Sequence, residues 1–344
     1  MKSPPKFLRA TKWKSATVEP LAGDASTRRY FRLRKGNETA ILMDASRVRE
    51  IVAPFVQINQ HLQKLGFSAP EILARDDKNG LLLLEDFGDE TFSHLLEKQF
   101  DSEKLFELAT DVLIALHKHP QAAPKNLRAY HPQKMLEDVE LFLEFPPSFS
   151  LSPPKRGEGQ GEGVLKNVPP HPVPLPRFAA EKEEIREEFQ KIWLDLLPLA
   201  HQVPASLLLR DYHVANLMLL PKRKGVRRAG LLDFQDAYAG PITYDLVSLL
   251  EDARRDVPAG LKEKMLACYL AEFPKLNRAD FEISLAILAA LRHTRVLAIF
   301  EKLHREGKSH YKKLHSPRVE RLLQQALSHP KLAALKNWFA KHGR

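Results

Sequence analysis

The stretch "LLLRDYHVANLMLL", residues 207–220, places a polar loop between two leucine-rich segments. The flanking segments predict two short buried strands. The loop between them begins at Asp211 and ends at Asn216. A turn that is polar only for solubility would account for the composition of this loop. A functional site requires that further polar groups converge on it.

A second apolar segment follows closely and predicts a β-hairpin. "NLMLL" (216–220) and "GLLDF" (230–234) are joined by the basic turn "PKRKGVRRA" (221–229). Two apolar runs separated by a polar turn are typical of paired antiparallel strands. We therefore expect Leu220 to lie near Gly230.

Three oxygen-bearing side chains are expected to converge at one end of this hairpin. Asn216 would lie beside Asp233, with neighbouring Cβ atoms about 4.5–5.5 Å apart, and Asp211 lies on the loop that enters the first strand. Carboxylate and carboxamide oxygens suit Mg²⁺, which keeps some waters and takes its other ligands from phosphates. We expect Asn216 and Asp233 to hold the metal and Asp211 to accept a proton from a substrate hydroxyl.

Two longer strings carry a resemblance to a known family. "RDYHVANLM" (210–218) and "LLDFQDAYAGPITYDLVSLL" (231–250) resemble the catalytic core of the aminoglycoside phosphotransferase and choline kinase superfamily, which is related to protein kinases. The closest resemblance is to the bacterial anomeric N-acetylmuramate/N-acetylglucosamine kinases of cell-wall recycling. "GDASTRRYFR", "ILMDAS" and "LLLLEDFGD" resemble the same family more weakly. The resemblance implies an α+β, two-lobed, protein-kinase-like fold with a small antiparallel-sheet N-lobe and a mainly helical C-lobe.

The same resemblance implies a role for each matching residue. Asp211 aligns with the catalytic aspartate, Asn216 with the metal-binding asparagine, and Asp233 with the metal aspartate of the Asp-Phe-Gly motif. That motif reads Asp-Phe-Gln here, because Gln235 replaces the glycine. Asp245 would brace the catalytic loop; as an isolated feature it is also a carboxylate at a helix N-terminus. The implied reaction is phosphoryl transfer from ATP with Mg²⁺, in which positioning and charge neutralisation carry the catalysis.

Two further polar residues near the loop are candidate substrate contacts. His213 lies within the loop and either braces it or faces the substrate. A metal role for His213 is not expected, because no second histidine lies at ligand spacing. Asp236 either faces the acceptor or caps the turn that follows it.

The first quarter of the chain predicts a small, mostly antiparallel sheet with one helix. "RYFRLR" and "TAILMDA" read as strands joined by the turn "KGNE", and "EILARDDKNGLLLLED" as two strands joined by an Asp-Lys-Asn-Gly turn. Residues 46–66 have a helical period, with Ser46 as the N-cap, Gly66 as the stop and a break near Pro54. We assign residues 1–87 to a nucleotide-binding N-lobe.

The turn "LAGDASTRRYFRL" in this lobe is expected to cover the nucleotide phosphates. Backbone amides at Gly23, Ser26 and Thr27 could donate to phosphate oxygens, although an ordinary hairpin is an equal alternative. Arg28 and Arg29 point to opposite faces if the chain is extended, so at most one of them reaches the nucleotide.

A literal Asp-Phe-Gly occurs a second time, at residues 86–88. It precedes the Asp211 loop, whereas the kinase order requires the metal aspartate to follow that loop. Its place after "LLLL" matches the hinge between two lobes instead. We expect the backbone around Glu85, Asp86 and Phe87 to contact the adenine.

Two departures from the family pattern keep a second function open. The strand "TAILMDA" lacks the kinase lysine and has Asp44 near its place, so Arg28 or Arg29 is the candidate substitute. Leu209 replaces the histidine that usually lies two residues before the catalytic aspartate. A catalytically silent nucleotide-binding pseudokinase is therefore the alternative from another functional class.

Residues 88–344 are assigned to a helical C-lobe that carries the catalytic loop and the metal site. A Pro/Gly-rich segment at 146–178 has no periodicity and is interpreted as a mobile insert. The favoured acceptor is the anomeric hydroxyl of an amino sugar, and a choline-type or aminoglycoside-type acceptor is the alternative. The residues that select the acceptor are expected around 130–200.

Composition bounds the remaining possibilities. The chain has 344 residues, which suits two lobes, and a formal net charge of +10. Residues 301–344 hold eleven Lys/Arg and three Glu, so a solvated basic helix face is favoured over a nucleic-acid groove. One cysteine, no signal-peptide pattern and no uninterrupted apolar run near about 18 residues favour a cytoplasmic protein without a membrane span. The expected partner is a small-molecule substrate, and the oligomeric state stays open.

Overall fold

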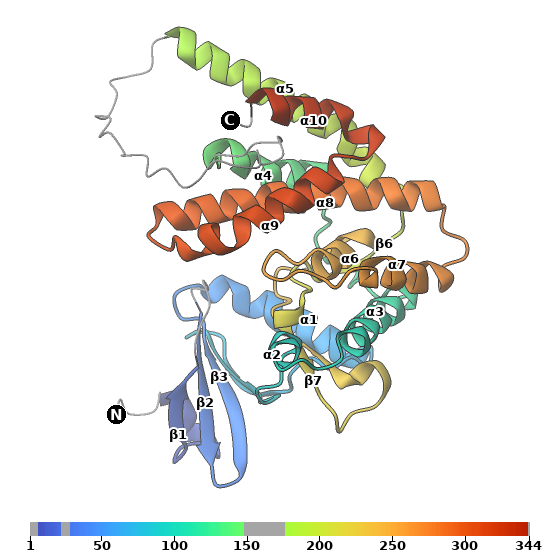
Figure 1. Ribbon diagram of the computed structural model, residues 1–344. Helices are drawn as coiled ribbons and strands as arrows, with labels where there is room; N and C mark the ends of the chain where they lie inside the picture. Colours follow the sequence, from blue (N-terminus) through green and yellow to red (C-terminus); the bar gives the residue numbers. More distant parts are fainter. Residues whose placement is uncertain (1–5, 22–27, 148–175, 343–344) are drawn as a thin grey trace. The chain divides into compact units, whose positions relative to one another are not determined.

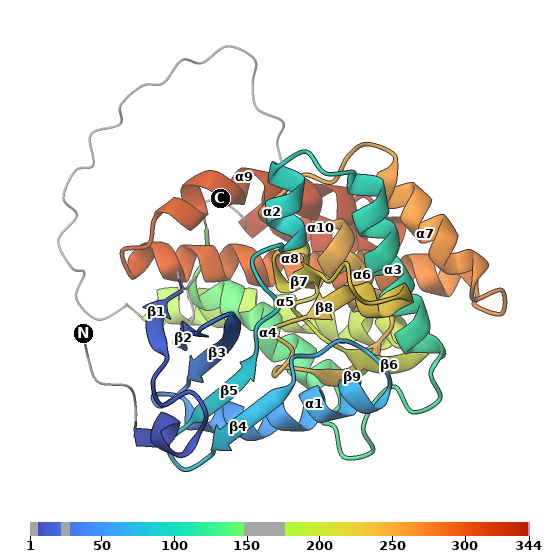
Figure 2. The same ribbon diagram turned by 90° about the horizontal axis from the view of Figure 1, so that it is seen from below.

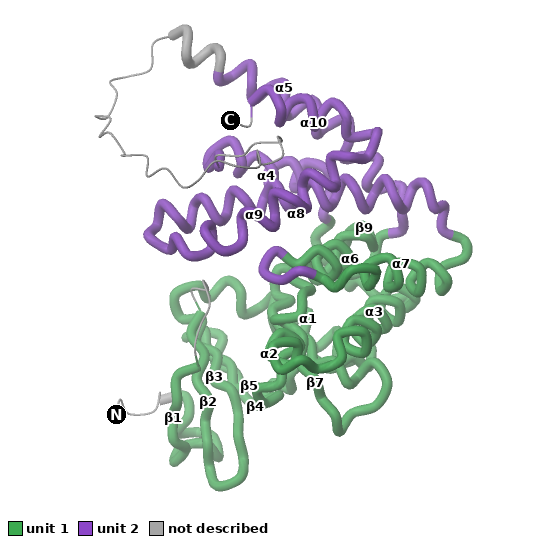
Figure 3. Tube along the Cα trace, viewed as in Figure 1, with its two compact units in different colours: residues 1–129, 205–252, 257–275 green, residues 130–204, 253–256, 276–344 purple. Residues whose placement is uncertain are grey.

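The computed structural model describes residues 6–21, 28–147 and 176–342. The chain divides into two compact units (Figure 3). Unit 1 contains the N-terminal sheet, the "RDYHVAN" loop and the hairpin after it, whereas unit 2 contains most of the later helices. These units do not correspond to the two expected lobes, and the lobe boundary at residue 87 stays a prediction. Their ranges are 1–129, 205–252 and 257–275 for unit 1, and 130–204, 253–256 and 276–344 for unit 2.

The N-terminal sheet is five-stranded and antiparallel, with the strand order β1-β2-β3-β5-β4 (Figure 2). Its first hairpin is the predicted one: the strands pair from Arg29–Asp44 to Lys35–Glu38. Gly36 completes the turn at φ +59°, a conformation that glycine adopts readily. The strands are β1 (Thr17–Pro20), β2 (Arg29–Lys35), β3 (Glu38–Asp44), β4 (Ile72–Asp76) and β5 (Leu81–Glu85).

Part of this sheet packs on the segment that precedes it. Leu8, in the 3₁₀ turn η1 (Lys6–Ala10), and Trp13 are buried against Leu33, Leu42 and neighbouring apolar residues. Burial of each such side chain contributes about 1.5–3 kcal/mol before the entropy of ordering is subtracted. The sheet therefore has an apolar core of its own.

The helix between the two hairpins begins later than the sequence predicted. The chain forms a 3₁₀ turn, η2 (Arg49–Ile51), and then α1 (Val52–Lys64), so the expected N-cap at Ser46 is wrong. Pro54 falls in the first turn of α1, where a missing N–H costs little. The stop at Gly66 is confirmed: this glycine takes φ +87° just beyond the C-cap.

The rest of the chain is mainly helical, which confirms the predicted fold class (Figure 1). Most of the predicted insert, residues 148–175, lies outside the described residues, and α5 begins at Pro176. The helices of unit 1 beyond the sheet are α2 (Phe92–Glu97), α3 (Ser102–Lys118), α6 (Thr243–Leu250) and α7 (Leu261–Ala271). Those of unit 2 are α4 (Pro132–Glu144), α5 (Pro176–Ala200), α8 (Arg278–Arg305), α9 (His310–Ala326), η5 (Pro330–Leu332) and α10 (Ala333–His342).

Among the described residues, α8 is long and apolar enough to cross a membrane. Charged residues interrupt its sequence, so the helix contains no continuous apolar run of that length. Its most apolar window has a mean hydropathy of 1.6, and 67% of that window is buried. The helix packs against α4, α5 and α9 within unit 2. Burial of this kind is typical of a core helix, and the cytoplasmic location stays a prediction.

Two short two-stranded sheets complete unit 1. β6 (Ala205–Leu208) pairs with β9 (Tyr238–Pro241), and β7 (Leu217–Leu219) pairs with β8 (Ala229–Leu231). The loop that carries Asp211 runs from β6 through the 3₁₀ turn η3 (Val214–Asn216) into β7, and a further 3₁₀ turn, η4 (Gly225–Arg228), precedes β8. These strands set the positions of the candidate site residues.

Candidate active site

A buried carboxylate holds the main chain immediately before Asp211. The backbone N–H of Leu209 donates to Oδ2 of Asp245 at 2.6 Å, and the N–H of Arg210 donates to Oδ1 at 2.9 Å. Asp245 lies in the first turn of α6 and is only 1% exposed. Arg210 takes φ +73°, a conformation that non-glycine residues adopt rarely. The two hydrogen bonds stabilise this turn and are the contacts that the predicted bracing role of Asp245 requires.

Asn216 ties the far end of the loop back to its beginning. Its Nδ2 donates to the carbonyl oxygen of Asp211 at 2.9 Å. The same Nδ2 lies 3.3 Å from Nε2 of His213, which is 6% exposed. Because the amide nitrogen is engaged in this way, Oδ1 is the atom of Asn216 that suits a cation. The contact of His213 with Asn216 favours the loop-bracing alternative for the histidine.

The register of the β7–β8 hairpin differs from the prediction. Met218 lies opposite Gly230, and Leu220 donates its N–H to the carbonyl of Arg228 at 2.7 Å. The strands pair further into the basic turn than expected, because η4 takes up part of that turn. Asn216 therefore lies beside Leu232, whose N–H donates to its carbonyl at 3.0 Å, rather than beside Asp233.

A cavity of about 430 Å³ in unit 1 nevertheless brings Asn216 and Asp233 together. Its walls include Arg28 just before β2, Glu85 at the end of β5 and Phe87 just after it, together with Asn216 before β7 and Asp233 after β8. Its size is typical of a small-molecule site. Among the described residues, Asp211 does not line the cavity and is joined to it through Asn216.

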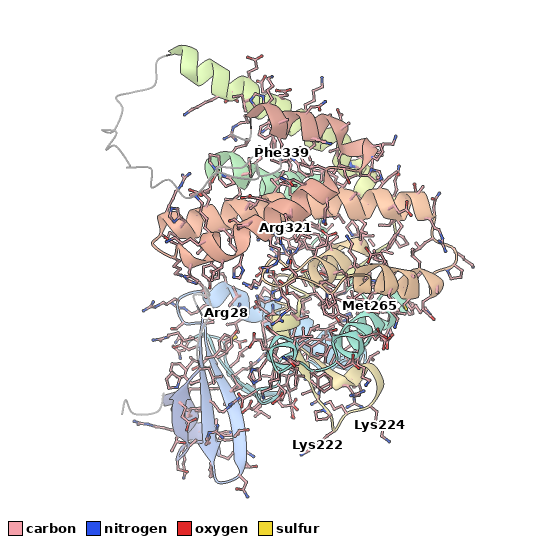
Figure 4. All side chains as sticks on the ribbon, viewed as in Figure 1. Arg28, Lys222, Lys224, Met265, Arg321 and Phe339 are labelled. Carbon is pink, nitrogen blue, oxygen red and sulfur yellow. The ribbon has the colours of Figure 1, made fainter. Side chains whose placement is uncertain are left out.

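Of the two candidate substitutes for the kinase lysine, Arg28 is the one that reaches this cavity (labelled in Figure 4). Its guanidinium pairs with Oδ1 of Asp233 and donates to Oε1 of Gln235 at 2.8 Å. Gln235 in turn donates to Oδ1 of Asp233 at 3.0 Å. Burial works to lower the pKa of Arg28, but nearby acidic groups, among them Asp233, outweigh it and raise the pKa. Arg28 thus stays charged beside the candidate metal aspartate.

Arg29 points elsewhere and pairs with Asp44 at 2.5 Å, with 55% of its side chain exposed. Burial would raise the pKa of Asp44, but hydrogen bonds from Ser46 and Arg29 lower it. The residue found near the place of the kinase lysine is therefore the partner of a surface arginine. Of the two candidate substitutes, Arg28 is the one in the cavity.

Arg32 is a cavity residue that the sequence reasoning missed. Its Nε lies 2.7 Å from Oδ2 of Asp86, and its two terminal nitrogens donate to Asp89 at 2.7 Å and to the carbonyl of Gly88 at 3.0 Å. The side chain of Asp86 is only 4% exposed. This aspartate is therefore committed to an internal ion pair, consistent with a hinge rather than a metal ligand.

Strand alternation could have identified Arg32. Tyr30 and Arg32 alternate along β2, and Arg28 continues the alternation just before the strand; all three line the cavity. Burial raises the pKa of Tyr30 to about 12, so its phenol stays neutral. The lining on this side combines two cations with a neutral hydroxyl.

A second missed residue, Arg223, holds the hinge from the basic turn. Its Nη2 lies 2.5 Å from Oε1 of Glu85, and its guanidinium lies 5.1 Å from the ring centroid of Phe87. The same ring packs so closely on Gly230 that a Cβ there would come within 2.7 Å of it. Arg223 is half-buried, whereas Lys222 and Lys224 in the same turn are exposed (Figure 4). The turn therefore positions the segment predicted to be the hinge.

Asp236 faces a different arginine. Its carboxylate accepts from Nε2 of Gln235 at 3.2 Å and lies 3.6 Å from the guanidinium of Arg128. Arg128 stacks on the ring of Tyr238, 4.0 Å from the centroid. Half of each charged side chain is exposed, so this pair is open to solvent.

The predicted phosphate-covering residues Gly23, Ser26 and Thr27 lie outside the described residues. Within the described part of the chain, no group of three or more His, Cys, Asp or Glu residues could hold a metal ion. A pair such as Asn216 and Asp233 still suits Mg²⁺, because this ion takes few protein ligands when phosphates and waters supply the others. The donor set fits the predicted metal.

The sequence pattern of the phosphotransferase enzyme family matches residues 17–281 of this chain. An N-acetylmuramate/N-acetylglucosamine kinase of Caulobacter vibrioides is 32% identical, over 98% of this chain and 94% of that protein. The kinase of the same name from Pseudomonas aeruginosa is 33% identical, over 93% and 87%.

Solved structures show the same fold at low identity. The choline kinase LicA from Streptococcus pneumoniae has a TM-score of 0.57 at 15% identity, covering 92% of this chain and 93% of that one. The gentamicin complex of APH(2")-IIa has a TM-score of 0.53 at 13% identity, covering 92% of both chains. These likenesses establish the architecture.

Proposed function

We propose, from the premise that this chain belongs to the phosphotransferase enzyme family, that it transfers the γ-phosphoryl group of ATP to the anomeric hydroxyl of N-acetylmuramate or N-acetylglucosamine. The family match and the relatives make the chain a kinase. The two relatives compared above are kinases of these sugars and match over most of both chains. The nucleotide, the metal and the acceptor are the proposed part.

The nucleotide would occupy the cavity in unit 1. The N–H of Glu85 already donates to the carbonyl of Glu71 at 2.8 Å, so the backbone of Asp86 and Phe87 is the proposed adenine contact. Arg28 would face the phosphates as the substitute for the missing lysine, because its charge lies inside the cavity. Backbone amides at Gly23, Ser26 and Thr27 would cover the phosphates.

Asn216 and Asp233 would hold Mg²⁺, which when bound neutralises charge on the transferring phosphates. Both residues line the cavity. Arg28 and Gln235 both donate to Oδ1 of the Asp233 carboxylate. The chain thereby orients this carboxylate through fixed partners rather than through a mobile side chain.

Asp211 would position the acceptor hydroxyl and take its proton as the new bond to phosphorus forms. The backbone on its N-terminal side is held by Asp245, and its own carbonyl is held by Asn216. Both contacts restrict the loop without using the Asp211 carboxylate. That carboxylate is therefore available for chemistry.

One observation carries this proposal: Asn216, which donates a hydrogen bond to the carbonyl of Asp211, lines the same cavity as Asp233. The catalytic and metal positions expected from the sequence are thus mechanically connected, although the hairpin register was predicted wrongly. A loop of this construction suits catalysis, whereas a silent nucleotide-binding module would not require it.

The test is an acceptor panel with purified protein, ATP and Mg²⁺, in which ADP release is followed and the phosphorylated position is assigned by ³¹P NMR. We expect turnover with N-acetylmuramate or N-acetylglucosamine, phosphate on the anomeric oxygen, and loss of turnover with retained ATP binding in Asp211→Asn. Turnover confined to choline or an aminoglycoside would replace the proposed acceptor. ATP binding without turnover on any acceptor would support the silent pseudokinase.

A further inference from the structure

Three backbone segments of unit 1 come together beside the catalytic loop. Leu208, the last residue of β6, lies opposite Tyr238, the first residue of β9. On the other side of β9, the N–H of Ala239 donates to the carbonyl of Arg128 at 2.9 Å. Adjacent strands are about 4.8 Å apart, so the backbone of Arg128 lies about two strand spacings from the end of β6. Asp211 follows that end by three residues.

The guanidinium of Arg128 is oriented by its neighbours, but among the described residues its N–H groups are not all engaged in hydrogen bonds. It lies over the ring of Tyr238, 4.0 Å from the centroid, and the guanidinium of Arg210 lies 5.3 Å from the same centroid. Its ion pair with Asp236 is 3.6 Å long, beyond the range of a normal hydrogen bond. The side chain of Arg128 is 55% exposed. In the described part of the chain, these are its side-chain contacts, so N–H groups of this guanidinium can bind an anion.

Gln235 connects this position to the candidate metal site. Its Nε2 donates to Oδ2 of Asp236 at 3.2 Å and to Oδ1 of Asp233 at 3.0 Å. A positive charge is therefore held beside the region where an acceptor would have to lie in order to reach Asp211.

We propose that Arg128 determines acceptor specificity by binding the lactyl carboxylate of N-acetylmuramate. This inference rests on the proposed function. The two candidate sugars share the anomeric hydroxyl, and N-acetylmuramate adds a lactyl ether that ends in a carboxylate. A planar guanidinium that is already stacked on a ring loses little freedom when it binds a carboxylate in a bidentate manner. The contact with the Tyr238 ring and the ion pair with Asp236 keep the guanidinium beside the site until the sugar binds.

The test compares three acceptors: N-acetylmuramate, its methyl ester, which keeps the lactyl ether but adds a methyl group and has no charge, and N-acetylglucosamine. Arg128→Gln should lower kcat/KM for N-acetylmuramate by about tenfold to a hundredfold, mainly through KM, because hydrogen bonds to a charged group are lost. It should leave the ester and N-acetylglucosamine unchanged, and Arg128→Lys should recover part of the loss.

Arg75→Gln is the matched control. Arg75 lies on β4, is 52% exposed, and pairs with Asp77 at 3.7 Å, so its environment is close to that of Arg128. It should leave kcat/KM unchanged for all three acceptors. Thermal unfolding of both glutamine variants should be alike, which separates recognition from stability.

Equal losses on the three acceptors, or no loss on N-acetylmuramate, would overturn the role of Arg128. Failure of the wild-type protein to phosphorylate any of them would overturn the proposed function instead. Calorimetric titration of N-acetylmuramate and N-acetylglucosamine, with ATP-free protein, then decides the inference by itself. Selective loss of N-acetylmuramate binding in Arg128→Gln supports it, and equal or absent binding of both sugars by the wild type contradicts it.

Discussion

The chain contains two Asp-Phe dipeptides, Asp86-Phe87 and Asp233-Phe234. Asp86 pairs with Arg32 in β2, and Asp233 pairs with Arg28, which immediately precedes β2. Asp86 is 4% exposed and faces Arg32. Asp233 is 31% exposed, faces Arg28 and lines the cavity. Both pairs line the cavity, but the side chains of Arg32 and Asp86 are 8% and 4% exposed and form the closed pair, whereas 31% of the Asp233 side chain is exposed, so Arg28 and Asp233 form the open pair. The same Asp-Phe dipeptide therefore forms a structural ion pair at Asp86 and part of a candidate metal site at Asp233.

The largest effect expected from this contrast is loss of turnover in Asp233→Asn. The amide keeps the size of the side chain but removes the charge that a phosphate-bound cation requires, so kcat should fall on the order of a thousandfold. Asp86→Asn is the matched control and should keep kcat near the wild-type value. Steady-state kinetics with saturating ATP and acceptor would measure both. An active Asp233→Asn together with an inactive Asp86→Asn would reverse the two assignments.

The next effect concerns the arginine in the open pair. Arg28→Met removes a charge that is 11% exposed inside the cavity, so KM for ATP should rise about tenfold or more. Arg29→Met, one position along the chain, removes a charge that is 55% exposed and should leave this KM unchanged. Equal changes in the two variants would show that general charge, and not the position of Arg28, attracts the nucleotide.

In the closed pair we expect a stability effect in place of a catalytic one. Asp86→Asn leaves the buried Arg32 with a weaker partner, although Asp89 and the carbonyl of Gly88 still contact it. The free energy of unfolding should fall by about 1–3 kcal/mol. Urea unfolding followed by circular dichroism would measure it. An unchanged midpoint would mean that the ion pair adds nothing to the fold.

The smallest expected effect lies at the outer side of the hinge. Arg223→Gln removes a half-exposed contact with Glu85 and a stacking contact with Phe87, worth together about 1 kcal/mol or less. We expect KM for ATP to rise about threefold, with kcat unchanged. Lys222→Gln, which changes an exposed neighbour, is the control. A larger change in Lys222→Gln would contradict the positioning role of Arg223.

The sequence predicted the first hairpin well because all of its signals are local. The strand from Arg29 to Lys35 alternates, Gly36 lies in the turn, and the pairing with Glu38–Asp44 follows from the loop length. The β7–β8 hairpin offered no such short turn. Its basic connection contains η4, so nothing local determined the register.

The candidate site residues also differ in whether local sequence signals identify them. Asp211, Asn216 and Asp233 were found because the chain brings them within one loop and one hairpin. Arg32 and Arg223 contact residues that are 54 and 138 positions away. Periodicity assigns a side chain to a face of its strand but does not identify its partner across the fold, so these contacts required coordinates.

Asp245 accepts hydrogen bonds from the main-chain N–H groups of Leu209 and Arg210. Every residue except proline offers the same N–H. The hydrogen bond to the N–H of residue 209 therefore does not depend on the side chain at that position. The side chain must only fit the buried site in which Leu209 is 3% exposed. An exchange of one apolar side chain for another at position 209 should therefore leave the main chain that leads into Asp211 in place.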